Sequence, residues 1–431
     1  MLDRITQPNI KVIKEIKPQE SNNYKLTNGI PVSSFNLGTQ EVIKIEIVYN
    51  TGTKDLENTV ILSAIAALFA DASSNKRSGK IIENLDFYGS YVKTSVEKDN
   101  LSFMLFCTTN KLGEALPLFV ESVLDSVYNE KALQTFLNNA KEKLKTELEK
   151  VNTICNREFT KEIFKGSSYN RVVELSNFDN VIAEDLYKFK EEYIQTDKMS
   201  IYVAGNFNDD EIKNSLNKYF GYLMINSKDT GIYNEFKSKP VKKFIKKEGS
   251  LQSAIRIGKI LDIDFGSQEY FNLKFLNVVL GGYFGSRLMS NIREDKGYTY
   301  GISSFISTND IAISFIIATE VGTKVTLAAL KEIYKEIVLL QNELVSDKEL
   351  ELVKNYLSGN LLNSITGPFA LSNQYKKLRL KGTDFSFLKD YLDSIHKIDA
   401  KTLRSIAVNH LQIDTMSEIV VGPSIKKTSN S

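Results

Sequence analysis

Residues 281–300 hold the side chains of this chain whose types and spacing could do chemistry. The candidates are Gly281, Gly282, Gly285, Ser286, Arg293 and Tyr300. A guanidinium is a permanently charged, planar fork that suits a backbone carbonyl or a carboxylate. A phenol can donate a hydrogen bond to the oxyanion that forms when water attacks an amide. Spacing alone favours a simpler interpretation, in which Arg293 pairs with Glu294 or Asp295 and Tyr300 packs at the start of a strand.

The three glycines do not form a dinucleotide-binding fingerprint. Gly281-Gly282-x-x-Gly285 lacks the G-x-G-x-x-G spacing, and it follows a helix-like segment rather than a strand. A structural explanation is a turn between two helices, with the glycines in the left-handed conformation.

Histidine is scarce in this chain. His396 and His410 are the two histidines, and they stand fourteen positions apart. Zinc sites carried by one helix use two imidazoles at i and i+4, so neither that motif nor its reverse can exist here. Both histidines fall beside predicted C-terminal helices, where the macrodipole favours them, and we interpret them as structural. Cys107 and Cys155 are interpreted as reduced, packed thiols, although a disulfide between them stays open.

Length and composition fit a two-domain globular protein. A chain of 431 residues exceeds one ordinary core, which favours two domains of about 200 residues. The net charge of +2 gives no basic excess of the kind that nucleic-acid binders carry. Residues 1–4 lack an apolar signal-peptide core, and the nearly apolar run 60–70 is too short for a membrane span. We therefore expect a cytoplasmic protein that binds neither nucleic acid nor membrane.

The two halves of the chain repeat one order of elements. The first half should contain a hairpin turning at Asn28-Gly29, a strand over 43–49 that alternates as if half-buried, helices over 57–70 and 79–87, a hairpin turning at Asp99-Asn100, and a helix over 116–127. The second half should contain a strand over 254–260, a helix over 270–280, a hairpin turning at Asn309-Asp310 with its second strand over 311–318, and a helix over 327–337. Corresponding points lie 210 or 211 residues apart, which indicates a duplication.

This order predicts an α+β fold of two homologous domains, each an antiparallel sheet with helices packed on one face. We place the first domain at residues 1–227 and the second at 240–431. The linker is expected at 228–239, where the apolar periodicity lapses.

Residues 281–300 resemble the C-terminal-half signature of the M16 family of metallopeptidases. That signature is a glycine loop, then Ser-Arg-Leu, then Leu-Arg-Glu-Lys-x-Gly-x-x-Tyr. This chain departs from it by Ile292 for Leu and Asp295 for Lys. Element order and length are similar to the short, two-domain branch of the family, like the mitochondrial processing peptidase, which implies the LuxS/MPP-like metallohydrolase fold.

The resemblance also implies roles for the candidate residues. In the family, the arginine and tyrosine that match Arg293 and Tyr300 reach from the C-terminal half to the active site, and the glycine loop faces the substrate chamber. Active members hold zinc with His-x-x-Glu-His on the buried helix of the first half and a later glutamate. The matching positions fall near Ala64, Ala67 and Leu68, which cannot bind a metal.

Two further positions depart from or only approximate the family pattern. Glu147 lies near the place of the third zinc ligand, but we interpret it as a solvated helix residue. Lys93 stands where the substrate-binding strand of the family often has Asn-Ala, which puts ordinary substrate binding by this half in doubt.

The sequence therefore supports one leading hypothesis and two alternatives. The leading one is a non-catalytic, substrate-binding subunit of a heterodimeric M16-type zinc peptidase. This chain would hold no cofactor, and it would supply Arg293 and Tyr300 to a His-x-x-Glu-His partner that carries the zinc and to a peptide substrate. The first alternative is a structural or peptide-holding pseudo-peptidase with no part in hydrolysis. The second is a homodimer with an unconventional metal site of Asp, Glu and Cys.

Overall fold

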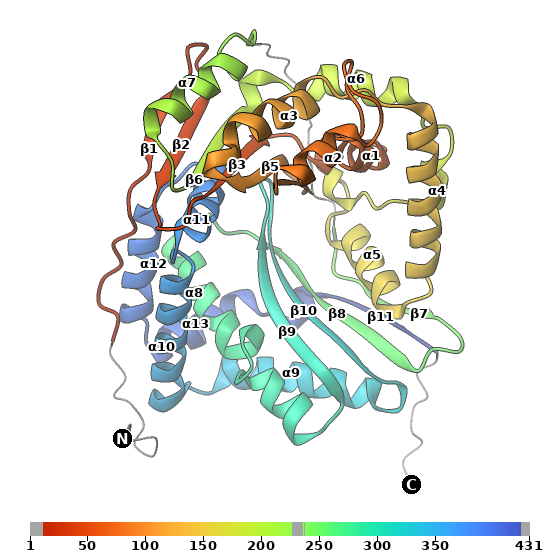
Figure 1. The fold of residues 1–431 in the computed structure, drawn as a ribbon. Coiled ribbons are helices and arrows are strands. Elements are labelled where there is room, and N and C mark those ends of the chain that lie inside the picture. Colours follow the sequence, from red (N-terminus) through yellow and green to blue (C-terminus); the bar gives the residue numbers. More distant parts are fainter. Residues whose placement is uncertain (1–11, 226–235, 237, 424–431) are drawn as a thin grey trace, which may run out of the picture.

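The computed structural model describes residues 12–225, 236 and 238–423. Figure 1 shows two halves, each a curved sheet with helices. Within the described ranges, no helix combines the length and the apolar character that crossing a bilayer requires.

The N-terminal half is built on a six-stranded sheet with the order β1-β2-β6-β3-β5-β4. Its strands are β1 (Asn22–Lys25), β2 (Pro31–Asn36), β3 (Val42–Tyr49), β4 (Tyr91–Val96), β5 (Leu101–Thr108) and β6 (Met199–Gly205). All neighbours are antiparallel except β2 and β6, which are parallel. The helices of this half are α1 (Val60–Leu68), α2 (Lys80–Phe87), α3 (Leu112–Leu124), α4 (Glu130–Glu147), α5 (Val151–Ile163), α6 (Ala183–Tyr193) and α7 (Asp209–Phe220).

The C-terminal half is built on a five-stranded sheet with the order β7-β11-β8-β10-β9. Its strands are β7 (Lys242–Lys246), β8 (Gln252–Leu261), β9 (Thr299–Thr308), β10 (Ile313–Gly322) and β11 (Ser417–Gly422). Only β7 and β11 are parallel neighbours among these strands. The helices are α8 (Gln268–Asn277), α9 (Thr326–Asn342), α10 (Asp347–Asn363), α11 (Pro368–Leu380), α12 (Ser386–Lys397) and α13 (Ala400–His410). If β2 is matched to β7, this sheet repeats the strand order of the first, as a duplication would produce.

The predicted α+β class with two sheets is confirmed, and element boundaries differ in detail. Helix α1 begins at Val60 rather than near residue 57, because Asn58 accepts a hydrogen bond from the Val60 amide and starts the helix there. Strand β10 begins at Ile313 rather than Ile311. The predicted linker 228–239 lies for the most part outside the described residues, so both domain limits stay predictions.

Each sheet is covered on its second face by a helix that comes from the other half of the chain. Helix α5 packs against β8 and β11, and α11 packs against β2 and β6 (Figure 1). The buried side chains of α5 recur every fourth residue, which places them in one stripe along the helix: Val151, Cys155, Phe159 and Ile163. The two halves are therefore joined by a reciprocal exchange of helices.

A buried ion network fastens α11 to β3. Lys44 and Glu46 of β3 are 2% and 0% exposed, and their Nζ and Oε2 atoms are 2.9 Å apart. From α11, the Lys376 ammonium lies 2.5 Å from Glu46 Oε1, and Asn373 Oδ1 accepts from Lys44 at 2.6 Å. The predicted half-buried strand is thus wrong for β3, because α11 covers the face on which its charged residues lie.

Candidate functional site

Tyr300 lies on the free edge of the C-terminal sheet, where an irregularity in strand pairing exposes it. In the β9–β10 ladder Thr299 pairs with Val321 and Ile302 pairs with Thr319, so Tyr300 and Gly301 together oppose one residue of β10. This is the geometry of a β-bulge, a feature that often re-aims a side chain beside a functional site. Ile302 packs into the helix-covered core, whereas Tyr300 is 91% exposed.

The Tyr300 pocket is polar and has a volume of about 360 Å³. Its walls include Arg256 and Gln252 from β8, Glu320 from β10 and Asn152 from α5, the helix contributed by the other half. The Arg256 guanidinium donates to the Asn152 amide oxygen and, at 2.9 Å, to the carbonyl of Ile255. A fixed cation and an exposed phenol therefore share one pocket, which suits a peptide carbonyl or carboxylate.

Sequence reasoning missed Arg256 as a pocket residue. It is 8% exposed and stands between Ile255 and Ile257, which point into the helix-covered core. A single arginine inside an apolar strand is the signal that could have found it, because a buried charge needs a specific partner.

Arg293 does not lie in the Tyr300 pocket. It belongs to a π-helical segment, Met289–Asp295, and its guanidinium carbon is 4.8 Å from the centroid of the Phe284 ring. It forms no ion pair with any described residue, so the local pairing with Glu294 or Asp295 is not seen. A half-buried arginine over an exposed ring is a cation–π arrangement that leaves its donors available.

The glycine loop is held close to β9 by its lack of side chains. A Cβ on Gly281 would fall 2.6 Å from Ser304 Oγ of β9, and one on Gly285 would fall 2.9 Å from the Tyr283 ring. Gly281, Gly282 and Gly285 all have negative or extended φ, so the interpretation as left-handed turn glycines is wrong.

Ser286 follows the loop and is buried. It is 1% exposed, and its hydroxyl has no hydrogen-bond partner among the described residues. The exposed members of the loop are Phe284 and Gly285. Next to it, Arg287 grips Glu349 with two hydrogen bonds of 2.9 and 2.8 Å, so this arginine of the signature fastens the loop to α10.

The helix that would carry a zinc motif has no ligands to offer. Ala64 is fully buried and Leu68 is 8% exposed in α1, and neither these nor Ala67 carries a donor atom in its side chain. Across the described ranges, no three His, Cys, Asp or Glu side chains gather as a metal site would need. The residues present therefore do not fit zinc.

The remaining candidate ligands are engaged elsewhere. Glu147 is solvated and lies 2.7 Å from Lys150, whose hydrogen bond lowers the pKa of the carboxyl. His396 Nε2 is 2.9 Å from the Ile13 carbonyl, and His410 Nε2 is 2.7 Å from Glu269 Oε1. Both histidines lie in the last turn of a helix, as predicted.

Comparisons with known proteins bear on this geometry. Residues 180–357 match the family described as Peptidase M16 inactive domain. The resemblance to M16 peptidases is confirmed. The M16-like chain has the two-sheet architecture of solved relatives: it superposes with a TM-score of 0.86 on the peptidase M16 inactive domain from Pseudomonas fluorescens, at 18% identity, covering 95% of this chain and all of that one. A protease from Helicobacter pylori gives a TM-score of 0.86 at 17% identity, covering 94% and 100%.

Curated relatives of the M16-like chain are described as a zinc protease, as an inactive metalloprotease and as a non-peptidase homologue. It is 23% identical to "Uncharacterized zinc protease YmxG" of Bacillus subtilis over 89% of this chain and 94% of the relative. It is 24% identical to "Probable inactive metalloprotease YmfF" of the same organism, over 71% and 73%. It is 25% identical to "Non-peptidase homolog YmxG" of Helicobacter pylori, over 55% of each. With the family description and α1, these names support a non-catalytic M16 homologue.

Proposed function

We propose that this chain is the substrate-holding, non-catalytic subunit of a two-subunit M16-type zinc peptidase. The observation that carries the proposal is the exposure of Tyr300, 91%, on a bulge that aims it away from its own core and into an open polar pocket. A tyrosine kept only for packing would be buried.

In this proposal the partner supplies the metal and the general base, and this chain supplies hydrogen-bond donors. The Tyr300 hydroxyl donates to the oxyanion that forms on the scissile carbonyl, where a donor is worth most because charge develops there. Arg293, with its donors free of carboxylates, grips the peptide farther along the chamber. The exposed part of the glycine loop, Phe284 and Gly285, contributes to the chamber wall.

The test is co-expression with a His-x-x-Glu-His M16 protein from the same genome. The expected result is co-purification and hydrolysis of a quenched-fluorescence peptide by the pair. Tyr300→Phe should lower kcat by about 10²–10³-fold with the complex intact. The matched control is Tyr222→Phe, since Tyr222 is 70% exposed and lies outside the Tyr300 pocket. Equal kcat for both variants would refute the role of Tyr300.

A second candidate is a peptide-holding or structural subunit with no part in hydrolysis. It is favoured by the position of Arg293, which stacks on Phe284 and does not line the pocket of Tyr300. Under this alternative the chain binds peptide or partner, and Tyr300→Phe leaves the turnover of any complex unchanged.

A further inference from the structure

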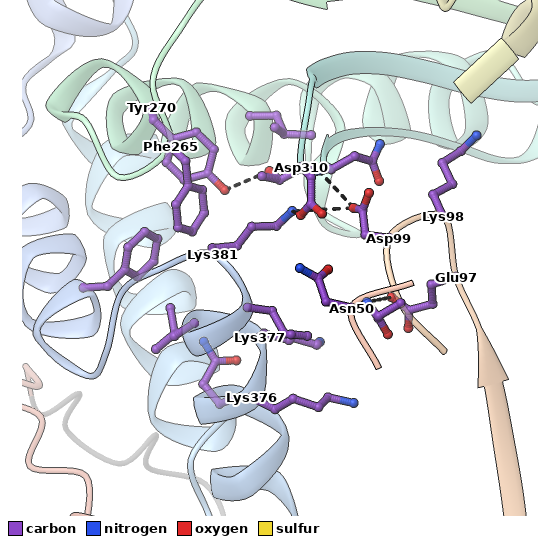
Figure 2. A pocket seen from close by; sticks show the side chains of 18 of the residues that line it. Asn50, Glu97, Lys98, Asp99, Phe265, Tyr270, Asp310, Lys376, Lys377 and Lys381 are labelled. Atoms are coloured by element: carbon purple, nitrogen blue, oxygen red, sulfur yellow. Dashed lines mark hydrogen bonds and ion pairs between the residues drawn. The ribbon is translucent and has the colours of Figure 1, made fainter. Parts of the chain in front are cut away.

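A cavity of about 500 Å³ lies between the two halves, where the β4–β5 and β9–β10 turns meet α8 and α11 (Figure 2). Its lining combines ammonium groups with aromatic rings. The lysines are Lys98, Lys274, Lys376, Lys377 and Lys381, and the rings are those of Phe265, Tyr270 and Phe387. No sequence motif contains these residues together, because they come from separate elements of both halves.

Three carboxylates line this cavity, and two of them, Asp99 and Asp310, are already neutralised. Asp310 lies 2.6 Å from Lys54 and 2.8 Å from Lys381, and its backbone amide donates to Asp99 at 3.0 Å. Burial alone would raise the pKa of Asp310, but the two lysines outweigh it and hold the pKa below its ordinary value. Figure 2 shows the Lys381 side chain reaching toward Asp310 and Asp99. Asp99 and Asp310 therefore leave little negative charge for the other lysines. The third carboxylate, Glu97, accepts hydrogen bonds from Ser95 and Asn100 and forms no ion pair with a lysine of the described chain.

Three lysines of the cavity remain without a carboxylate partner in the described chain. Lys376 is paired with Glu46, whereas Lys98, Lys274 and Lys377 form no ion pair there. Lys98 donates to the Tyr169 carbonyl at 2.9 Å, so its donors are partly used. Lys274 and Lys377 are therefore the cations available to a ligand.

Lys274 is the more unusual of the two. It is half-buried on α8, its ammonium lies 4.4 Å from the centroid of the Tyr391 ring, and no described residue accepts a hydrogen bond from it. Burial lowers its pKa to about 8, and the nearby charge of Lys377 adds to this. A half-buried ammonium without an acceptor is costly, and a bound anion would offset that cost.

Lys274 also lines a second cavity, of about 390 Å³. That cavity runs along Ser304, Phe305 and Ile306 of β9, which is the edge strand of its sheet. An edge strand offers backbone donors and acceptors to an extended peptide. A peptide lying along β9 could thus place a residue beside Lys274 without leaving the chamber.

We propose that Lys274 and Lys377 form a subsite for the carboxylate of a peptide, with Phe265 and Phe387 lining the space beside it. This inference rests on the proposed peptide-holding function and names its substrate class: peptides with an acidic residue or a free C-terminus placed in this cavity. A carboxylate on a short apolar stem matches ammonium groups set among rings, and each charge-assisted hydrogen bond would favour it over the neutral amide.

The test measures binding to the isolated chain by fluorescence anisotropy. The probes are four labelled alanine-rich peptides that differ only in a central Glu or Gln and in a free or amidated C-terminus. Wild-type protein should bind at least one acidic peptide about ten- to a hundredfold more tightly than the peptide with neither carboxylate. If affinity falls when Glu is replaced by Gln, the side-chain carboxylate is the group bound. If it falls when the C-terminus is amidated, the terminal carboxylate is the group bound.

Variants tie this preference to the cavity. Lys274→Met should abolish the preference for acidic peptides, and Lys274→Arg should retain this preference. Lys389→Met should leave the preference unchanged, because that exposed lysine of α12 lies outside the cavity. Lys377→Gln, at an exposed position, should weaken it severalfold and covers the case that Lys274→Met does not fold.

Three results would overturn the subsite. Equal binding of all four peptides, or an unchanged preference in both Lys274→Met and Lys377→Gln, removes it while peptide holding stands. Competition by inorganic phosphate that displaces the acidic peptide at equal concentration reassigns the lysines to phosphate. Failure of every peptide to bind wild-type protein removes the proposed function as well.

Discussion

The buried network between β3 and α11 gives the sharpest prediction about how the two halves hold together. Glu46→Gln keeps the shape of the side chain but removes the one carboxylate that Lys44 and Lys376 share. Lys44 is 2% exposed and cannot reach water without moving α11. The variant therefore leaves an uncompensated ammonium between β3 and α11.

The size of the effect follows from the geometry. At the 2.9 Å between Lys44 and Glu46, Coulomb's law with an effective dielectric constant of about 20 gives an attraction of about 6 kcal/mol. Desolvation of the ions offsets part of this, and removal of one partner of a buried pair costs about 3–5 kcal/mol. Free energies of folding are about 5–15 kcal/mol in total, so the loss should be large.

The assay is amide hydrogen exchange resolved by mass spectrometry. If opening of α11 becomes easier by that amount, amides in residues 368–380 should exchange about 10²–10⁴-fold faster. Lys243→Gln is the matched control, because it removes ion pairs between the halves, to Glu158 and Glu162 of α5, from a lysine that is 43% exposed. That control should change exchange by less than about fivefold. A rise below tenfold in α11, or an equal rise in both variants, would refute the reasoning.

The effect of Glu46→Gln should also depend on pH. Burial by itself would raise the pKa of Glu46, but Lys44 and Lys376 together outweigh it, and the pKa lies below its ordinary value of 4.5. Stabilisation from such a group is fully present above the unfolded-state pKa and is lost as the pH falls through the folded-state pKa. The difference in stability between wild type and variant should therefore be constant near neutral pH and shrink below about pH 4.5.

Two further predictions concern buried groups elsewhere. Gly281→Ala should lower the free energy of unfolding by about 1–3 kcal/mol, because the new methyl group meets Ser304 at 2.6 Å. Gly359→Ala in helix α10 meets nothing and should be neutral or stabilising. A thermal melt that ranks the two variants the other way would contradict this. Cys107 and Cys155 are free, and burial raises the pKa of each thiol to about 12, so the native protein should react with a disulfide reagent far more slowly than the unfolded chain; rapid release of thiolate from native protein would show that the reasoning is wrong.

Local signals in the sequence were enough for much of the fold. The Asn28-Gly29 turn joins β1 to β2, and the turns at Asp99 and Asp310 fall between the strands that alternation had predicted. These features depend on residues close in sequence, where turn chemistry and periodicity act directly. The hairpins at Asp99 and Asp310 occupy matching places in the two sheets, so those two predictions supported each other.

The burial of β3, the exposure of Tyr300 and the cavity around Lys274 could not be predicted from local sequence, because they depend on segments far apart in the chain. The alternation of Lys44 and Glu46 with isoleucines indicates a solvent face, yet α11, whose Lys376 is 330 residues from Glu46, covers that face. The exposure of Tyr300 depends on a change of register between β9 and β10 that no residue type announces. The cavity around Lys274 exists only where two hairpin turns and two helices meet.

The exchange of α5 and α11 bears on whether each half of the chain could fold by itself. The repeat suggests two units that could be made one at a time, but a fragment ending before β7 would lack the helix that shields β2 and β6, and the remaining fragment would lack the one that shields β8 and β11. Either fragment alone would expose apolar strands to solvent. The two fragments mixed should associate through α5 and α11 without a peptide bond between them. We therefore expect that neither half folds stably without the helix that the other half supplies.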